Sequence, residues 1–140
     1  EENAYDYVIC NPPYHVPDQR NSPDHLKNLA HRLEAGGLDG WMRTAASALR
    51  PGGRLHMIWR TDRLKEALDT VCDRFGSISL LPLHSRSGAP ASRVMIRGRR
   101  GSRAPLCMMH GVVLHDEAGR QTSIADALLN GTARLPDPPA

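Results

Sequence analysis

The chain has 140 residues, of which 40% are apolar and 24% charged, and its net charge is +3. This composition suits one folded domain or part of one, and it excludes a disordered chain. Cys10, Cys72 and Cys107 lack the Cys-x-x-Cys spacing of a zinc site or redox dithiol, so we expect reduced thiols and no metal. No apolar run approaches the roughly 18 residues of a membrane span, and the acidic start is unlike a signal peptide. We therefore expect a cytoplasmic protein without membrane contact.

The first half of the chain predicts one strand and two helices. Tyr5 to Cys10 form a short apolar strand that ends at Asn-Pro-Pro, and residues 16–23 form a polar, proline-containing loop. Helical spacing of apolar residues follows from Leu26 to Leu33, ending at Gly36-Gly37. A second helix ends at Pro51-Gly52-Gly53, and its apolar face consists of Leu38, Trp41, Met42, Ala45 and Leu49.

The second half predicts a helix between strands. Residues 54–60 form a strand, and Thr61 or Asp62 caps a helix that continues to Gly76. Further strands are expected over residues 77–83 and 93–97, with a weaker candidate over 112–115. This alternation favours an α/β sheet with mostly parallel strands, formed by residues 1–131. Residues 132–140 contain several prolines and are expected to form a flexible tail.

Asn11-Pro12-Pro13-Tyr14 directly follows the first strand and is suited to catalysis on an amine. An exocyclic amine of a base is a poor nucleophile until two acceptors on its N–H bonds direct its lone pair toward a methyl donor. The Asn11 side-chain oxygen and the Pro12 carbonyl can be those acceptors, and consecutive prolines hold them in place. Tyr14 offers a ring on which an unpaired or flipped base can stack. The alternative is an ordinary Asn-Pro-Pro turn with Tyr14 in the core.

Asp6 to Tyr14 resemble the fourth-strand motif of class I methyltransferases, which use S-adenosylmethionine, and Leu49 to Leu55 resemble their turn into the fifth strand. Ser85-Arg86 and the stretch from Ala91 to Gly101 resemble the C-terminal strands of the bacterial tRNA adenine-N6 methyltransferases. The resemblance implies the C-terminal half of a Rossmann-like sheet, comprising the fourth to seventh strands. In that fold the strand order is 3-2-1-4-5-7-6, so these four strands are neighbours.

The chain departs from this family in one respect. No Gly-rich strand-to-helix turn for the cofactor precedes Asn11, and Gly36 to Gly40 follow no predicted strand, so we interpret them as a helix break. Of the cofactor-binding residues, only Asn11 is present. We therefore expect the chain alone to be inactive and not to bind S-adenosylmethionine. We also expect Tyr5 to Cys10 to be an apolar edge strand that self-associates or is covered by other material.

The stretch between Asp73 and Asp116 contains no acidic residue but several arginines. Beside a base-modifying site, such arginines are candidates for phosphate contacts with tRNA or another RNA. The alternative is a solvated basic face. The predicted substrate-binding residues are Pro13, Arg97, Arg99, Arg100 and Arg103.

These patterns favour methylation of an exocyclic amine on a nucleic-acid base, with adenine N6 in tRNA as the first hypothesis. Methylation of a glutamine side-chain amide in a translation factor uses the same chemistry and is the second. The third is a non-catalytic RNA-binding module that keeps the motif as a structural turn.

Overall fold

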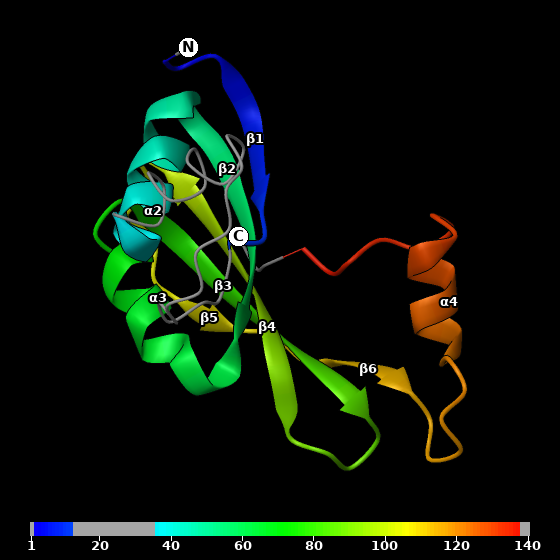
Figure 1. The fold of residues 1–140 in the computed structure, drawn as a ribbon. Helices are drawn as coiled ribbons and strands as arrows, with labels where there is room; N and C mark the ends of the chain where they lie inside the picture. The colour runs from blue at the N-terminus through cyan, green and yellow to red at the C-terminus, as the bar shows by residue number, and fades with distance from the viewer. Residues whose placement is uncertain (1, 13–35, 138–140) are drawn as a thin grey trace, which may run out of the picture.

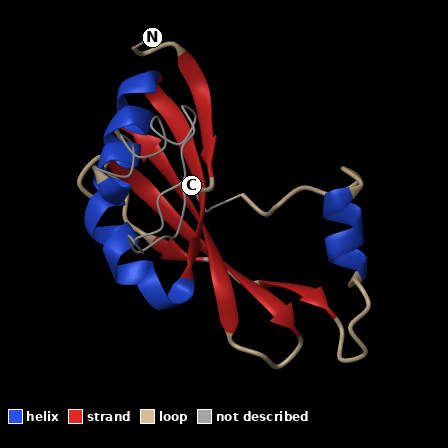
Figure 2. Cartoon of the chain, viewed as in Figure 1, coloured by secondary structure: helices blue, strands red, loops and turns tan. Residues whose placement is uncertain are grey.

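The computed structural model describes residues 2–12 and 36–137. Along the chain it contains the following elements (Figure 1, Figure 2): β1 (Tyr5–Cys10), α2 (Gly37–Ala48), β2 (Leu49–Arg60), the 3-10 turn η1 (Thr61–Arg63), α3 (Leu64–Val71), β3 (Phe75–Arg86), β4 (Ala91–Arg100), β5 (Cys107–Met108), β6 (Val112–His115) and α4 (Ser123–Leu129). The predicted loop over residues 16–23 and the helix from Leu26 to Leu33 lie outside the described residues.

The strands form one sheet in the order β1-β2-β4-β3-β5, with β6 also paired to β3. Taking β1 to β4 as the fourth to seventh strands, this is the predicted order 4-5-7-6. The predicted α/β fold class is confirmed. Figure 1 shows α2 and α3 on one face of the sheet, while α4 stands apart beyond the opposite face. We call this opposite face the open face.

The expectation of mostly parallel strands is confirmed, with β4 at the centre of the sheet as the exception among the described strands. The pairs β1/β2, β3/β5 and β3/β6 are parallel, but β4 runs antiparallel to both β2 and β3. The reason is the short connection between β3 and β4, formed by residues 87–90. A parallel pair needs a crossover of a dozen or more residues, whereas antiparallel strands can be joined by a tight turn.

The predicted boundary between α2 and β2 needs correction. The helix ends at Ala48, and Leu49 is already extended, with φ −72° and ψ 138°, and pairs with Tyr5 of β1. Pro51-Gly52-Gly53 therefore lie within β2, where the register with β1 shifts, and Gly52 adopts φ +82°. Glycine is suited to this irregular backbone because it adopts positive φ without a steric penalty. The predicted strand over residues 54–60 began too late.

The helix predicted up to Gly76 is also too long. Its last residue is Val71, and Phe75 begins β3. Phe75 is buried like Val71 and follows it at helical spacing, so periodicity alone did not separate the two elements. Neither Thr61 nor Asp62 caps the helix, since the Thr61 hydroxyl donates instead to the Ala91 carbonyl, 2.7 Å away.

Two elements near the C-terminus were not predicted. These are the short strand β5 and helix α4, whose N-cap Thr122 accepts a hydrogen bond from the Ala125 amide at 3.2 Å. The candidate strand over residues 112–115 is confirmed as β6. Beyond α4, the Pro136 carbonyl accepts a hydrogen bond from Arg97 of β4 at 2.8 Å. Among the described residues, no helix is long and apolar enough to span a membrane.

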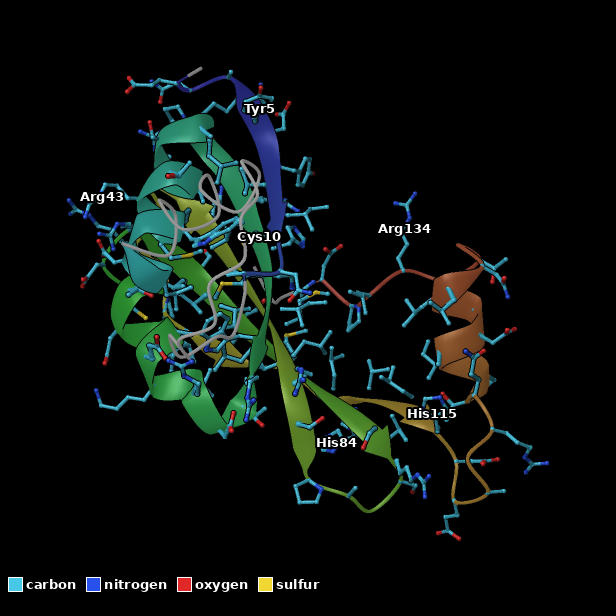
Figure 3. The ribbon with its side chains drawn as sticks, viewed as in Figure 1. Tyr5, Cys10, Arg43, His84, His115 and Arg134 are labelled. Atoms are coloured by element: carbon cyan, nitrogen blue, oxygen red, sulfur yellow. The ribbon has the colours of Figure 1, made fainter. Side chains whose placement is uncertain are left out.

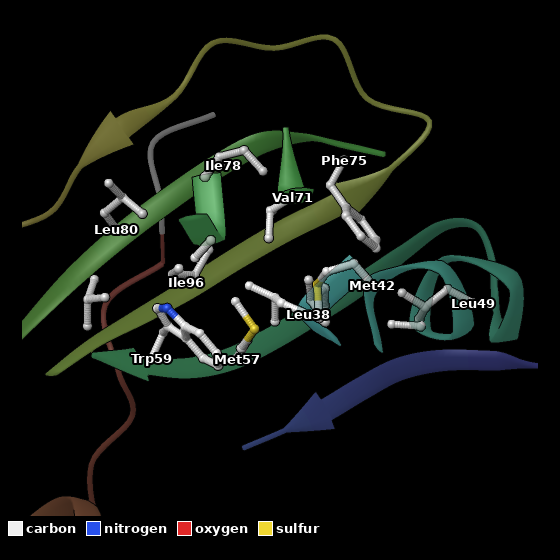
Figure 4. Packing of buried hydrophobic residues seen from close by; sticks show 14 residues of the cluster. Leu38, Met42, Leu49, Met57, Trp59, Val71, Phe75, Ile78, Leu80 and Ile96 are labelled. Carbon is white, nitrogen blue, oxygen red and sulfur yellow. The ribbon is translucent and has the colours of Figure 1, made fainter. Parts of the chain in front are cut away.

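The main core lies between α2, α3 and the helix-covered face of the sheet (Figure 4). Met42 and Ala67 of the helices are fully buried against strand residues such as Leu55, Met57 and Ile96. Trp59 is 2% exposed and donates from its ring nitrogen to the Arg63 carbonyl at 3.0 Å. The strands alternate between this face and the open face, as period-two patterning requires.

The positions of two isoleucines predict unequal losses in the free energy of unfolding when each is replaced by alanine. Ile96 is fully buried in β4, whereas Ile9 of β1 is 83% exposed. Ile96→Ala should lower the free energy of unfolding by about 2 to 5 kcal/mol, because it removes buried methyl groups and leaves a cavity. Ile9→Ala should change it by less than about 0.5 kcal/mol. Urea unfolding of both variants measures the difference, and equal losses would contradict the assigned faces.

Candidate functional site at the carboxyl end of strand β1

The Asn-Pro-Pro-Tyr motif begins where β1 ends. β1 runs parallel to β2, with Cys10 opposite Met57, so the carboxyl ends of both strands point the same way. Ligands in open α/β sheets bind outside the carboxyl ends of parallel strands. In Figure 3, Tyr5 marks the amino end of β1 and Cys10 its carboxyl end, which is the end nearer to His84 and His115. Asn11 thus occupies a position at which this architecture places ligands.

Asn11 and Pro12 differ sharply in exposure. Pro12 is fully buried, while Asn11 is exposed. A buried ring with a fixed φ anchors the backbone directly after Asn11, so the position of the amide side chain is restricted. Pro13 and Tyr14 lie outside the described residues, and their predicted roles stay predictions.

Cys10 is the titratable group next to the motif. Burial raises the pKa of its thiol to about 11. At neutral pH the thiol therefore keeps its proton, and the nucleophilic form, the thiolate, is scarce. This agrees with a site in which Asn11, and not the neighbouring cysteine, acts on the substrate.

The open face carries a row of paired residues across the sheet, just before the level of Asn11. Ile9 of β1 is opposite His56 of β2, His56 is opposite Arg97 of β4, and Arg97 is opposite Ser79 of β3, which in turn is opposite Cys107 of β5. Directly paired residues place their side chains on the same face of a sheet. We call this set the cross-sheet row.

Arg97 is the buried member of the row that sequence analysis assigned to substrate. Its side chain is only 7% exposed, its Nε donates to Ser79 Oγ at 3.0 Å, and its Nη1 donates to the Pro136 carbonyl at 2.8 Å. The pKa of the neighbouring His56 imidazole is lowered. Desolvation is the largest cause, and the charges of Arg97 and Arg54 add to it.

The other predicted substrate arginines lie toward the opposite end of the sheet from Asn11. Arg99 is exposed and pairs in register with Arg54, three residues before Met57 on β2. At about 3.3 Å per residue, Arg99 is roughly 13 Å from the level of Asn11 along the strands. Arg103 is exposed, follows the end of β4 and lies beside Gly76 of β3, which pairs with Arg99.

Arg100 has protein partners at this same end. Its Nη1 donates to the Asn3 side chain and to the Leu49 carbonyl, so it connects the starts of β1 and β2. Arg99, Arg103 and Arg54 are all exposed near this end of the sheet, and we call these three residues the amino-end patch. The structure pairs Arg99 with Arg54, which the sequence had not singled out, whereas Arg103 lies beside Gly76 and lines a hollow with Cys72 and Phe75.

Cations closer to the motif have acidic partners. Arg60, the last residue of β2, donates from Nε to Asp62 at 2.8 Å, and Arg63 forms an ion pair with Glu66 at 2.7 Å. These pairs reduce the net positive charge at the carboxyl end of the sheet. Within residues 2–12 and 36–137, no group of three or more His, Cys, Asp or Glu side chains could hold a metal.

Comparisons with known proteins now bear on this geometry. The chain matches none of the known protein-family profiles. It is 29% identical over 98 residues to the tRNA1(Val) (adenine(37)-N6)-methyltransferase of Pedobacter heparinus, a match that covers 68% of this chain and 41% of that protein. A crystal structure of a predicted O-methyltransferase from Agrobacterium tumefaciens is similar with a TM-score of 0.75 and 27% identity, covering 96% of this chain and 55% of the other.

The two matches confirm the resemblance to class I methyltransferases, in sequence and in fold. The chain spans about half the length of these proteins. Both matched proteins are described as methyltransferases, but they differ in the atom that is methylated. The substrate of this chain is therefore a matter for proposal.

The buried thiol beside the motif predicts a specific labelling order. Cys72 is exposed, and desolvation, Asp73 and Asp69 raise the pKa of its thiol, whereas Cys10 is partly buried and burial raises its pKa to about 11. At pH 7.5 iodoacetamide should modify Cys72 well before Cys10, because only thiolate reacts. Raising the pH to 9.5 should speed labelling of Cys10 by more than tenfold. Peptide mass spectrometry over time measures both rates, and fast labelling of Cys10 at pH 7.5 would show that the end of β1 is open to solvent.

Proposed function

We propose that this chain forms the substrate side of an S-adenosylmethionine-dependent N-methyltransferase that acts on an exocyclic amine of a nucleic-acid base, namely adenine N6 in tRNA. The observation that carries the proposal is the position of Asn11-Pro12 at the carboxyl end of β1, with Pro12 buried and Asn11 exposed. The similarity to a tRNA adenine-N6 methyltransferase supports the choice of base and RNA. A role in tRNA modification agrees with the expected cytoplasmic location.

In this proposal Asn11 accepts a hydrogen bond from the target amine through its side-chain oxygen. The Pro12 carbonyl accepts the second, and together they hold the nitrogen with its lone pair directed at the methyl group. Tyr14 stacks on the base, and Pro13 keeps the loop rigid. S-adenosylmethionine supplies an electrophilic methyl group when bound, and Asn11 borders it. The amine can release its proton after transfer, so the chain needs no strong general base.

The amino-end patch has a separate role in the proposal. Arg54 and Arg99 lie roughly 13 Å from the level of Asn11 along the strands, which places the patch away from the phosphates next to the target base. Arg99 and Arg103 instead contact phosphates several nucleotides away, and the substrate has to be long enough to reach them. This also favours RNA over a glutamine side chain, because a basic surface attracts a polyanion.

Removal of the Asn11 amide should affect transfer more than binding. In the complete enzyme Asn11→Ala should lower the single-turnover rate by about 10²- to 10³-fold, the scale for losing a positioned polar contact to the reacting group. The affinity for S-adenosylmethionine, measured by calorimetry, should change much less. Asn130→Ala is a matched control, since Asn130 is exposed and directly follows α4, away from β1.

A normal methylation rate in Asn11→Ala would instead favour the RNA-binding module, in which the motif is only a turn. To separate the two catalytic hypotheses, tRNA and a translation release factor can be offered together with labelled S-adenosylmethionine. Label in the protein alone would identify glutamine as the acceptor.

The amino-end patch predicts a dependence on RNA length. Replacing Arg99 and Arg103 with Gln should raise the KM for tRNA and flatten its salt dependence, with little change in kcat. A short oligonucleotide around the target base should show no such difference between variant and wild type. Arg43→Gln removes one charge from the helix-covered side and is the control. An unchanged KM and salt slope for tRNA would identify the patch as a solvated face.

A further inference from the structure

Arg97 occupies an unusual position for a charged residue. It lies in the middle of the cross-sheet row, flanked by His56 and Ser79, and it is only 7% exposed. Arginine keeps its proton in proteins, so this guanidinium cannot escape burial by becoming neutral. Its charge has to be balanced by neighbouring groups.

The partners of Arg97 do not balance that charge. Ser79 Oγ and the Pro136 carbonyl are neutral acceptors. The Nη2 atom is buried and has no hydrogen-bond partner among the described residues. Burial lowers the pKa of Arg97, and although the charge of Asp137 opposes this shift, no ion pair joins the two residues in the described structure.

The neighbours on the open face add positive charge. Arg54 of β2 lowers the pKa of both His56 and Arg97. A buried cation without a counter-ion destabilises the folded state, and an unsatisfied buried donor adds to that loss. Such costs persist in a protein when an anion offsets them in the functional state.

We propose that Arg97, Ser79 and His56 form a binding site for one carboxylate group on the open face of the sheet. Arg97 donates through Nη2, and the Ser79 hydroxyl, which accepts from Arg97 Nε, still has its own hydrogen to donate. The backbone at Pro136 forms one wall, and the exposed Ile9 and Tyr7 of β1 adjoin the other end of the row.

A carboxylate fits the site better than a phosphate. It carries a single negative charge that matches the single buried cation, and it can accept from two donors at once through two oxygens. The site is separate from the proposed amine contacts of Asn11, so it does not depend on the proposed methyl transfer.

The test uses acetate as the probe and requires no methyl transfer. The melting temperature of the chain is measured in sodium acetate and in sodium chloride at equal ionic strength and pH. Acetate should raise it in a saturable manner, by about 3 to 5 °C at ten times the Kd. Arg97→Met should lose the acetate-specific rise. Arg99→Met changes the next residue on the same face and should respond like wild type.

A second measurement needs no variant. Acetate at the site should raise the pKa of His56, because the negative charge of acetate offsets the positive charges of Arg97 and Arg54. An NMR titration of the His56 ring measures this pKa with and without acetate. Absence of both acetate effects would overturn the proposal, and so would effects produced by inorganic phosphate but not by acetate.

Discussion

The short connection between β3 and β4 is the constraint on which the rest of the sheet depends. Residues 87–90 allow only an antiparallel return, and β4 then inserts between β3 and β2. Once that register is set, each residue of β4 is assigned a face. Val94 and Ile96 enter the core beneath the helices, while Arg97 and Arg99 face the other way. A shift by one residue would bury the arginines in the core and expose the apolar side chains.

Local sequence signals predicted the parts of the fold that local physics determines. The strand Tyr5 to Cys10 was bounded by an apolar run and two prolines, and the structure has the same limits. Apolar periodicity also identified the buried residues Leu38, Met42 and Ala45 of α2. The family resemblance, and not periodicity, gave the strand order. Helix α4 was missed although Thr122 and the following Ala125 and Leu128 carry the signals of a capped helix.

Features set by distant contacts could not be predicted. The burial of Arg97 depends on Ser79 and on Pro136, which is 39 residues away. From the sequence alone it was one arginine among several in a basic stretch. The same limit applies to the position of Arg99 and Arg103, because the register of β4 against β2 decides which end of the sheet they occupy. The boundary between α2 and β2 depended on Leu49 pairing with Tyr5.

The position of β1 at the margin of the sheet has a consequence for the order in which the fold forms. The β3–β4 hairpin closes over a few residues and can form early, whereas β1 pairs only with β2 among the described strands, joining Cys10 to the distant Met57. Non-local pairing is slow because loop entropy is lost before contacts compensate for it. Amide hydrogens of β1 should therefore exchange by local opening at a lower free energy than those of β4. In this chain the segment that presents Asn11 thus opens at a lower free energy than the centre of the sheet.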